Sequence, residues 1–290
     1  MTHRLRAATS RCNNPAAFLR AFVLVVAVLS APGARADLVW HWEDSFSAEE
    51  QTMLTAWLSE TADAVQRWAG TYPFDVHLYL HRRDGAREPV PWANTWRNGQ
   101  QAIHFHVDPT YPKEAFLADW TAPHEFAHLF LPYLGRSNAW AAEGFASYLQ
   151  YVLMVELGVI TPGEAERRRG AKMDRAQARL AQSSEPLPAR LDELRAQRDY
   201  PAFYWGGAVF WERIDAGLRE QEQSLQVVLR SFLDCCRMRA DSFSTLVSTL
   251  DRVSASTIFS AELALMNEVP GCPARPEASG RDLSAPVISE

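Results

Sequence analysis

Apolar residues recur at helical spacing in the first strongly patterned segment of the chain, between Ser47 and Gly70. Ser47 suits an N-cap, and Glu50 three residues later completes the pattern of a capping box. The large apolar residues that follow lie at helical intervals: Met53, Leu54, Trp57, Leu58, Val65 and Trp68. Because this spacing places them on one face, the segment predicts an amphipathic helix that ends near Gly70.

The pattern then changes to an alternation of polar and apolar positions, which is typical of strands. Residues 74–81 alternate in this way, and residues 92–97 and 102–107 do so on either side of Asn98 and Gly99. An Asn-Gly pair between two such runs predicts a β-hairpin with a tight turn.

Helical patterns continue from Glu114 almost to the end of the chain. They include a charged stretch at residues 163–181 and an amphipathic run at residues 208–233. We therefore expect an α+β fold with two lobes. A small α/β lobe with an antiparallel hairpin spans residues 37–113, and a mainly helical lobe follows at residues 114–268.

The two ends of the chain differ from these lobes in composition. Residues 269–290 are rich in Pro, Ser and Ala, which predicts a mobile tail. Residues 1–36 have the features of a signal peptide, because arginines precede an apolar run at residues 21–29 and an A-x-A cleavage site ends at Ala36. The apolar run is too short to span a bilayer. We expect a periplasmic or secreted protein without a stable membrane anchor.

Composition excludes one class of partner. The net charge of −6 provides no basic field for nucleic acid, and the sequence has no P-loop and no G-x-G-x-x-G segment for a nucleotide. It does not predict an oligomeric state.

Three cysteines follow the expected cleavage site: Cys235, Cys236 and Cys272. An odd number leaves at least one thiol free or paired with another chain. In an oxidising compartment, a bridge from Cys235 or Cys236 to Cys272 is one alternative. No histidine is close to them in sequence, which favours a structural role.

The segment from Thr121 to His128 contains an H-E-x-x-H motif. Residues four apart share one face of a helix, so His124 and His128 can turn ring nitrogens toward one Zn²⁺ ion. Glu125 is rotated by about 100° from His124, which places its carboxylate beside the metal as a general base. Pro123 suits the first turn of such a helix.

A third ligand follows at Glu143, fifteen residues after His128. Two histidines and one carboxylate, with a fourth position open, are a standard set for catalytic zinc. The intervening residues contain Pro132, Gly135 and Asn138, which predict a turn and a second helix that starts near Asn138.

These two motifs together resemble the gluzincin metallopeptidases, the group that contains the thermolysin-like and aminopeptidase N-like enzymes. The second motif reads Trp140-x-x-Glu143-Gly144-Phe145-Ala146-x-Tyr148. Within the group the chain is most similar to the glycyl aminopeptidase-like family, from roughly residue 90 to residue 268. The resemblance implies a thermolysin-like catalytic domain with one Zn²⁺ per chain and a peptide or protein substrate.

The segment that begins at Tyr200 resembles that family's Tyr-x-Lys-Gly motif at the head of a helix. The resemblance implies that Tyr204 donates a hydrogen bond to the oxyanion of the reaction. Gly206 stands where the motif has lysine, the stretch between His128 and Glu143 is short, and we expect no PDZ-like domain.

A further departure concerns the substrate's amino terminus. Neighbouring aminopeptidase families carry a Gly-x-x-Glu segment about thirty residues before the zinc helix, and residues 90–97 contain no acidic residue. Aminopeptidase and endopeptidase or oligopeptidase activity therefore both stay open. In gluzincins the substrate pairs with an edge strand, which makes the hairpin the equivalent here and Trp92 and Asn94 candidate substrate-binding residues, together with Tyr200.

Four more histidines lie in the predicted strands. His104 and His106 share one face of a strand and could bind metal, and His77 and His81 raise the same question. Their alternative role is as solvated or hydrogen-bonded side chains.

The motifs favour hydrolysis of peptide bonds, with His124, His128 and Glu143 as zinc ligands and Glu125 and Tyr204 as catalytic residues. The alternative is a non-catalytic module that binds peptides on a peptidase fold. Intact Glu125 and Tyr204 favour the enzyme, because a binding module has no use for a base beside an open metal position.

Overall fold

The computed structural model describes residues 36–181 and 183–276. The expected signal peptide, apart from Ala36, therefore lies outside the described residues, and so do residues 277–290. Within the described part, no helix combines the length and the hydropathy that are needed to cross a membrane.

A four-stranded sheet forms the first part of the fold, in the order β1-β2-β4-β3. Its strands are β1 (Leu38–Trp42), β2 (Val76–Arg82), β3 (Trp92–Trp96) and β4 (Ala102–Val107). Strands β3 and β4 are antiparallel, which confirms the predicted hairpin, and β2 is parallel to both of its neighbours. The sequence patterns did not predict β1. Strand β3 lies at an edge of the sheet.

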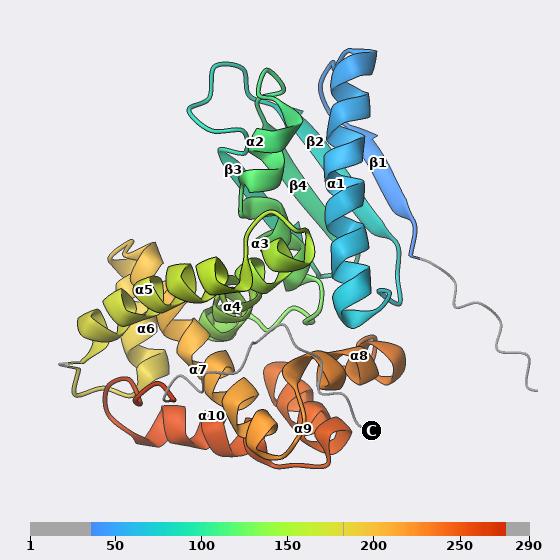
Figure 1. The fold of residues 1–290 in the computed structure, drawn as a ribbon. Coiled ribbons are helices and arrows are strands. Elements are labelled where there is room, and N and C mark those ends of the chain that lie inside the picture. The colour runs from blue at the N-terminus through green and yellow to red at the C-terminus, as the bar shows by residue number, and fades with distance from the viewer. Residues whose placement is uncertain (1–35, 182, 277–290) are drawn as a thin grey trace, which may run out of the picture. The chain divides into compact units, whose positions relative to one another are not determined.

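Helix α1 (Ala48–Ala69) covers one face of this sheet (Figure 1). The predicted capping box is present, since the Ser47 side chain accepts from the backbone of Glu50 and the Glu50 carboxylate accepts from the backbone of Ser47. The chain leaves the helix at Gly70 with a φ of 91°, a conformation that favours glycine. Trp57 of α1 is fully buried against Phe105 of β4.

The rest of the described chain is helical. Its α-helices are α2 (Lys113–Ala118), α3 (Thr121–His128), α4 (Ala139–Glu156), α5 (Pro162–Leu180), α6 (Leu187–Ala196), α7 (Tyr200–Glu220), α8 (Leu225–Cys235), α9 (Phe243–Ser254) and α10 (Ile258–Glu268). Figure 1 shows α3 and α4 between the sheet and the later helices. The observed fold is thus mixed α and β, as expected, with all strands before residue 113.

Helices α4 and α7 approach each other closely at two glycines. A Cβ atom on Gly144 would lie 2.2 Å from the Gly207 carbonyl carbon, and one on Gly207 would lie 2.2 Å from the Trp140 oxygen. Two hydrogen bonds also join the helices. Trp211 Nε1 donates to the Ala141 oxygen at 2.8 Å, and the Tyr148 hydroxyl donates to an Asp215 carboxylate oxygen at 2.7 Å. This contact fixes the positions of Glu143 and Tyr204, because each side chain extends from one of the two helices.

The amphipathic run predicted at residues 208–233 is broken in the structure. Helix α7 ends at Glu220, and Glu222 has a φ of 58°. Helix α8 then begins after Ser224, whose side chain accepts from the Val227 amide, while Asp215 accepts from the Leu225 amide at 3.0 Å. Local hydrogen bonds at a turn therefore outweigh a continuous apolar pattern.

The described part of the predicted tail, residues 269–276, contacts the helices. Arg275 forms ion pairs with Glu212 of α7 and Asp174 of α5, and Pro270 forms an isolated bridge with Pro186. The Gly271 amide also donates to the Glu185 backbone oxygen at 2.9 Å, so both ion pairs and backbone hydrogen bonds attach this segment.

The cysteines also differ from the expected arrangement. Cys235 and Cys236 are bonded to each other at the end of α8, and Cys272 is a free thiol. The proposed bridge from either residue to Cys272 is therefore absent. Burial raises the pKa of the Cys272 thiol to about 12.

Candidate metal centre

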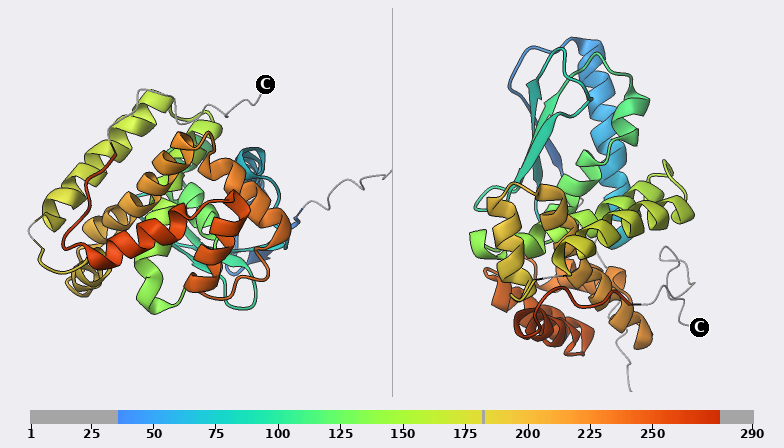
Figure 2. Two further views of the ribbon diagram at one scale, coloured as in Figure 1. Left: turned by 90° about the horizontal axis from the view of Figure 1, so that it is seen from below. Right: turned by 90° about the vertical axis from the view of Figure 1, so that its left-hand side faces the viewer.

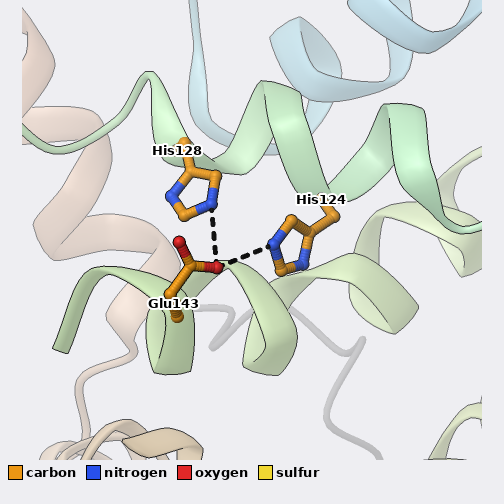
Figure 3. A group of neighbouring side chains, drawn as sticks. All are labelled: His124, His128 and Glu143. Atoms are coloured by element: carbon orange, nitrogen blue, oxygen red, sulfur yellow. Dashed lines mark hydrogen bonds and ion pairs between the residues drawn. The ribbon is translucent and has the colours of Figure 1, made fainter. Parts of the chain in front are cut away.

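Helix α3 presents both histidines of the H-E-x-x-H motif to α4. All eight of its residues are buried, and its first turn is held by the Asp119 carboxylate, which accepts from the Thr121 amide at 2.7 Å. His124 and His128 lie one turn apart, and both rings point toward α4 (Figure 3).

Glu143 of α4 meets both rings. One of its carboxylate oxygens lies 3.3 Å from His124 Nε2 and 3.4 Å from His128 Nε2. The three ligand atoms are all within 4.8 Å of one another, and within the described chain they form the one group of three or more such side chains that could hold a metal ion. Two imidazoles and a carboxylate around a common point fit Zn²⁺.

The far side of the His124 ring supports this assignment. His124 Nδ1 lies 3.0 Å from the Gln150 side-chain oxygen, on the same helix as Glu143 and seven residues later. When Nδ1 carries the proton and donates to Gln150, the lone pair of Nε2 is free for a metal. Gln150 was not predicted, although its seven-residue spacing from Glu143 places both on one face of a helix. His128 Nδ1 has no hydrogen-bond partner among the described residues.

The electrostatics of the three side chains follow from their burial and mutual contact. Burial opposes ionisation of Glu143, but His128 and His124 outweigh it and hold the pKa of the carboxyl well below its usual range. Burial also opposes protonation of His124, where contact with Glu143 still raises the pKa. At His128 burial dominates and lowers the pKa. The carboxylate is thus anionic, as a metal ligand must be.

Glu125 lies next to this group and is held by the edge strand. Its carboxylate accepts a hydrogen bond from the Thr95 hydroxyl of β3 at 2.6 Å, and the same hydroxyl is 3.0 Å from the Glu125 backbone oxygen. Only 7% of Glu125 is exposed. The sequence did not reveal Thr95, because its contact with Glu125 depends on β3 lying beside α3.

Tyr204, in the second turn of α7, lies near the His124 ring. The two ring centres are 6.1 Å apart. Burial, reinforced by the charges of Glu143 and Glu125, raises the pKa of Tyr204 well above its usual value, so the hydroxyl keeps its proton. Tyr200 stands 6.1 Å from Tyr204 by ring centres and is 46% exposed. The structure thus places Tyr204 near the His124 ring and Tyr200 beside Tyr204.

The structure explains the glycine at the motif's lysine position. A Cβ atom on Gly206 would lie 2.6 Å from Leu191 and 2.9 Å from Leu180. Helices α5 and α6 therefore occupy the space that a longer side chain would need.

Trp92 and Asn94 do not join the cluster. Side chains alternate along β3, and the rings of Trp92 and Trp96 pack on His106 and His104 on one face of the sheet. Thr95 points to the opposite face, toward Glu125. The two candidates therefore lie on the face of the sheet that is turned away from the metal ligands.

Two arginines that sequence reasoning missed hold the end of α3. Arg97 donates to the His128 backbone oxygen at 3.2 Å, and Arg237 donates to the Leu129 oxygen at 3.0 Å. Cations at this position complement the carbonyls at a helix end, which have no hydrogen-bond partner within the helix. Burial lowers the pKa of both guanidinium groups.

Comparisons with known proteins give a distant likeness. No model of a known family matches the chain, and no curated protein matches it. Among solved structures it is similar to an M1 zinc metallopeptidase from Deinococcus radiodurans, with 18% identity, a TM-score of 0.49, and coverage of 83% of this chain and 49% of that one. A mutant of an M1 zinc metallopeptidase from the same organism, bound to a Tyr-Ser-Ala substrate, gives 16% identity, a TM-score of 0.48, and coverage of 81% and 49%. A two-domain M1 zinc metallopeptidase mutant bound to L-arginine gives 16% identity, a TM-score of 0.45, and coverage of 84% and 51%. The chain spans about half the length of each, and at these values the likeness carries no functional argument.

Proposed function

We propose that this protein is a zinc-dependent peptidase that hydrolyses peptide bonds with water. One observation carries the proposal: the side chains of His124, His128 and Glu143 converge on one point, and the carboxylate of Glu125 lies beside them, oriented by Thr95. A purely structural zinc site has four protein ligands and no need of an oriented base.

Each nearby side chain has a role in this proposal. Glu125 accepts a proton from the attacking water and passes it to the leaving amine. The protonated Tyr204 hydroxyl donates to the carbonyl oxygen as negative charge develops there. Gln150 keeps the His124 ring in the orientation that ligation needs. A zinc ion in this site would polarise the scissile carbonyl and lower the pKa of a coordinated water toward about 7.

The position of β3 supports a peptide as the substrate. It is an edge strand, so an extended peptide could pair with its free backbone groups. Because Thr95 of β3 contacts the proposed base Glu125, a peptide paired with β3 would lie close to the Glu125 carboxylate. The motif residues Glu143 and Tyr204 also support a relation to the glycyl aminopeptidase-like family, from which Gly206 departs.

The test compares the wild-type chain with Glu125→Ala and His128→Ala. All three are incubated with a mixed peptide library, which is read by mass spectrometry, and bound zinc is measured by elemental analysis. We expect cleavage by the wild type alone, full zinc in Glu125→Ala and loss of zinc in His128→Ala. Full activity of Glu125→Ala would contradict the mechanism. Zinc-loaded wild type that binds peptides without cutting them would favour a peptide-binding module. The positions cut will separate removal of amino-terminal residues from internal hydrolysis.

A further inference from the structure

Trp120 lies on the same face of α3 as the two histidines of the candidate metal centre. Trp120, His124 and His128 follow one another at intervals of four residues, and Trp120 already has helical backbone angles although α3 begins at Thr121. The ring centres of Trp120 and His124 are 5.3 Å apart, and the two planes are nearly perpendicular. Such an edge-to-face contact is a favourable arrangement of aromatic rings. The indole therefore lies against a proposed metal ligand, one helical turn before it.

The exposure of the side chains changes abruptly along this face. His124 and His128 are buried, as are all the other residues of α3, whereas 43% of Trp120 is exposed. The Glu143 side chain is 26% exposed, so solvent also reaches the carboxylate that meets both histidines. The face is thus closed at His128 and open to solvent at Trp120.

Helix α7 has a similar arrangement at its first turn. Tyr200 and Tyr204 are four residues apart with ring centres separated by 6.1 Å, and Tyr204 in turn lies 6.1 Å from His124. The outer ring is again the more open one, since Tyr200 is 46% exposed and Tyr204 is half-buried. Trp120, His124, Tyr204 and Tyr200 therefore form one series of neighbouring rings with an exposed ring at each end.

A peptide at this centre would meet the series beside the reacting bond. The right-hand view of Figure 2 shows the sheet above and helices α7 to α10 below it, and the centre takes Thr95 from the edge strand and Tyr204 from α7. The scissile carbonyl would lie at the metal that His124 ligates, and the indole packs on that histidine. The side chains next to the scissile bond are therefore the ones that come closest to Trp120.

The chemistry of the exposed rings selects the class of side chain. Ligand sites in proteins are lined mainly by apolar and aromatic groups, and an indole that is exposed to water gains when an apolar group covers it. Asp119, which precedes Trp120, accepts a hydrogen bond from the Thr121 amide and so already has a partner. We propose that Trp120, together with Tyr200, forms a subsite that selects an aromatic or large aliphatic side chain next to the scissile bond. This subsite rests on the proposed peptidase function and names the class of peptide that the enzyme prefers.

The test uses alanine hexapeptides in which one residue at a time is replaced by Phe, Leu, Lys or Glu. Cleavage by the zinc-loaded chain is read by mass spectrometry, and kcat/KM is measured for each peptide. Trp120→Ala removes the indole, and Trp120→Phe keeps an aromatic ring. Trp96→Ala is the matched control, because Trp96 is 55% exposed but packs on His104, on the sheet face turned away from the metal ligands. Circular dichroism checks that every variant is folded.

We expect the wild type to prefer Phe and Leu over Ala, Lys and Glu at one position next to the cleaved bond by about tenfold or more, which is the discrimination that apolar contacts provide. Trp120→Ala should lose most of this preference, whereas Trp120→Phe and Trp96→Ala should keep it. Equal kcat/KM for all the peptides, a preference for Lys or Glu, or an undiminished preference in Trp120→Ala would each overturn the assignment.

Peptide binding to the zinc-loaded Glu125→Ala protein separates the subsite from the reaction. Fluorescence anisotropy of labelled peptides measures affinity without turnover, and we expect tighter binding of the Phe and Leu peptides, which the added Trp120→Ala change abolishes. If the wild type cuts no peptide and this difference in affinity is present, the peptidase proposal fails and the subsite stands. If the Glu125→Ala protein binds all the peptides alike, or binds none, the subsite proposal fails even when the wild type cuts them.

Discussion

The hydroxyl of Thr95 donates a hydrogen bond to the carboxylate of Glu125 at 2.6 Å, across thirty residues of chain. A threonine hydroxyl has one proton, so it cannot also donate to the Glu125 backbone oxygen at 3.0 Å. The shorter contact involves the charged group and is the stronger of the two. The edge strand therefore sets the orientation of the side chain that we propose as the base.

Replacement of Thr95 by valine should slow catalysis without loss of zinc. Valine keeps the shape of the side chain and removes the hydroxyl, whereas Thr95→Ser keeps the hydroxyl. A hydrogen bond to a charged group is worth about 1.5–3 kcal/mol, so we expect kcat to fall about tenfold to a hundredfold in Thr95→Val. Thr95→Ser should restore most of kcat. Steady-state kinetics with zinc analysis checks this, and equal kcat values for the two variants would show that the hydroxyl has no such role.

Signals that act within about one turn or one hairpin predicted much of the fold. The capping box at Ser47 and the hairpin of β3 and β4 depend on local signals, and both are present. The strands are joined by residues 97–101, however, because Trp96 pairs with Ala102, so the tight turn predicted at Asn98 and Gly99 is absent. The H-E-x-x-H motif likewise predicts two side chains on one helix face, which is what α3 shows. The same reasoning failed at α7 and α8, because the helical pattern of apolar residues continues through the turn at Glu222 that separates the two helices.

Contacts between distant segments were not predictable in this way. Strands β1 and β2 are parallel and are connected through α1, so no short-range pattern predicts their pairing. Thr95 contacts Glu125 and Gln150 contacts His124, and the partners are separated in sequence by thirty and twenty-six residues. Sequence spacing found the side chains that bear the proposed chemistry, and the fold was needed to find those that position them.

Removal of the Tyr204 hydroxyl should lower kcat more than it changes KM. The proposed hydrogen bond forms as charge develops on the carbonyl oxygen, so Tyr204→Phe loses an interaction of the transition state. Loss of a single oxyanion donor costs about a hundredfold to a thousandfold in kcat. Tyr200→Phe is the matched variant on the same helix, and as a candidate substrate contact it should affect KM instead. A KM effect without a kcat effect for Tyr204→Phe would assign the hydroxyl to ground-state binding.

Loss of the Gln150 amide should weaken zinc binding. Gln150→Leu leaves His124 Nδ1 without its partner at 3.0 Å, and the ring loses the contact that holds its orientation. Mutation of such outer partners typically costs about tenfold to a hundredfold in metal affinity. Gln150→Glu retains an oxygen acceptor and should stay close to wild type or bind more tightly. Competition with a zinc chelator measures both, and unchanged affinity in Gln150→Leu would rule out this supporting role.

The close approach of α4 and α7 should make Gly207 intolerant of even one methyl group. A Cβ atom there would lie 2.2 Å from the Trp140 oxygen, and backbone cannot yield as a flexible side chain can. Overpacking of this kind costs about 1–3 kcal/mol, and for a chain of this size each kcal/mol lowers Tm by about 2–4 °C. Gly207→Ala should therefore melt several degrees below wild type.

Gly170 provides the matched control, because it also lies inside a helix but has open space around its Cβ position. Gly170→Ala should be neutral or stabilising by up to about 1 kcal/mol, since alanine loses less backbone freedom on folding. The strain in Gly207→Ala should also separate α4 from α7 and so move Glu143 away from Tyr204. We therefore expect its kcat to fall at temperatures where the protein is still folded. Calorimetry and kinetics on the same samples distinguish the two effects, and a Gly207→Ala protein as stable and active as Gly170→Ala would show that the helices are free to move apart.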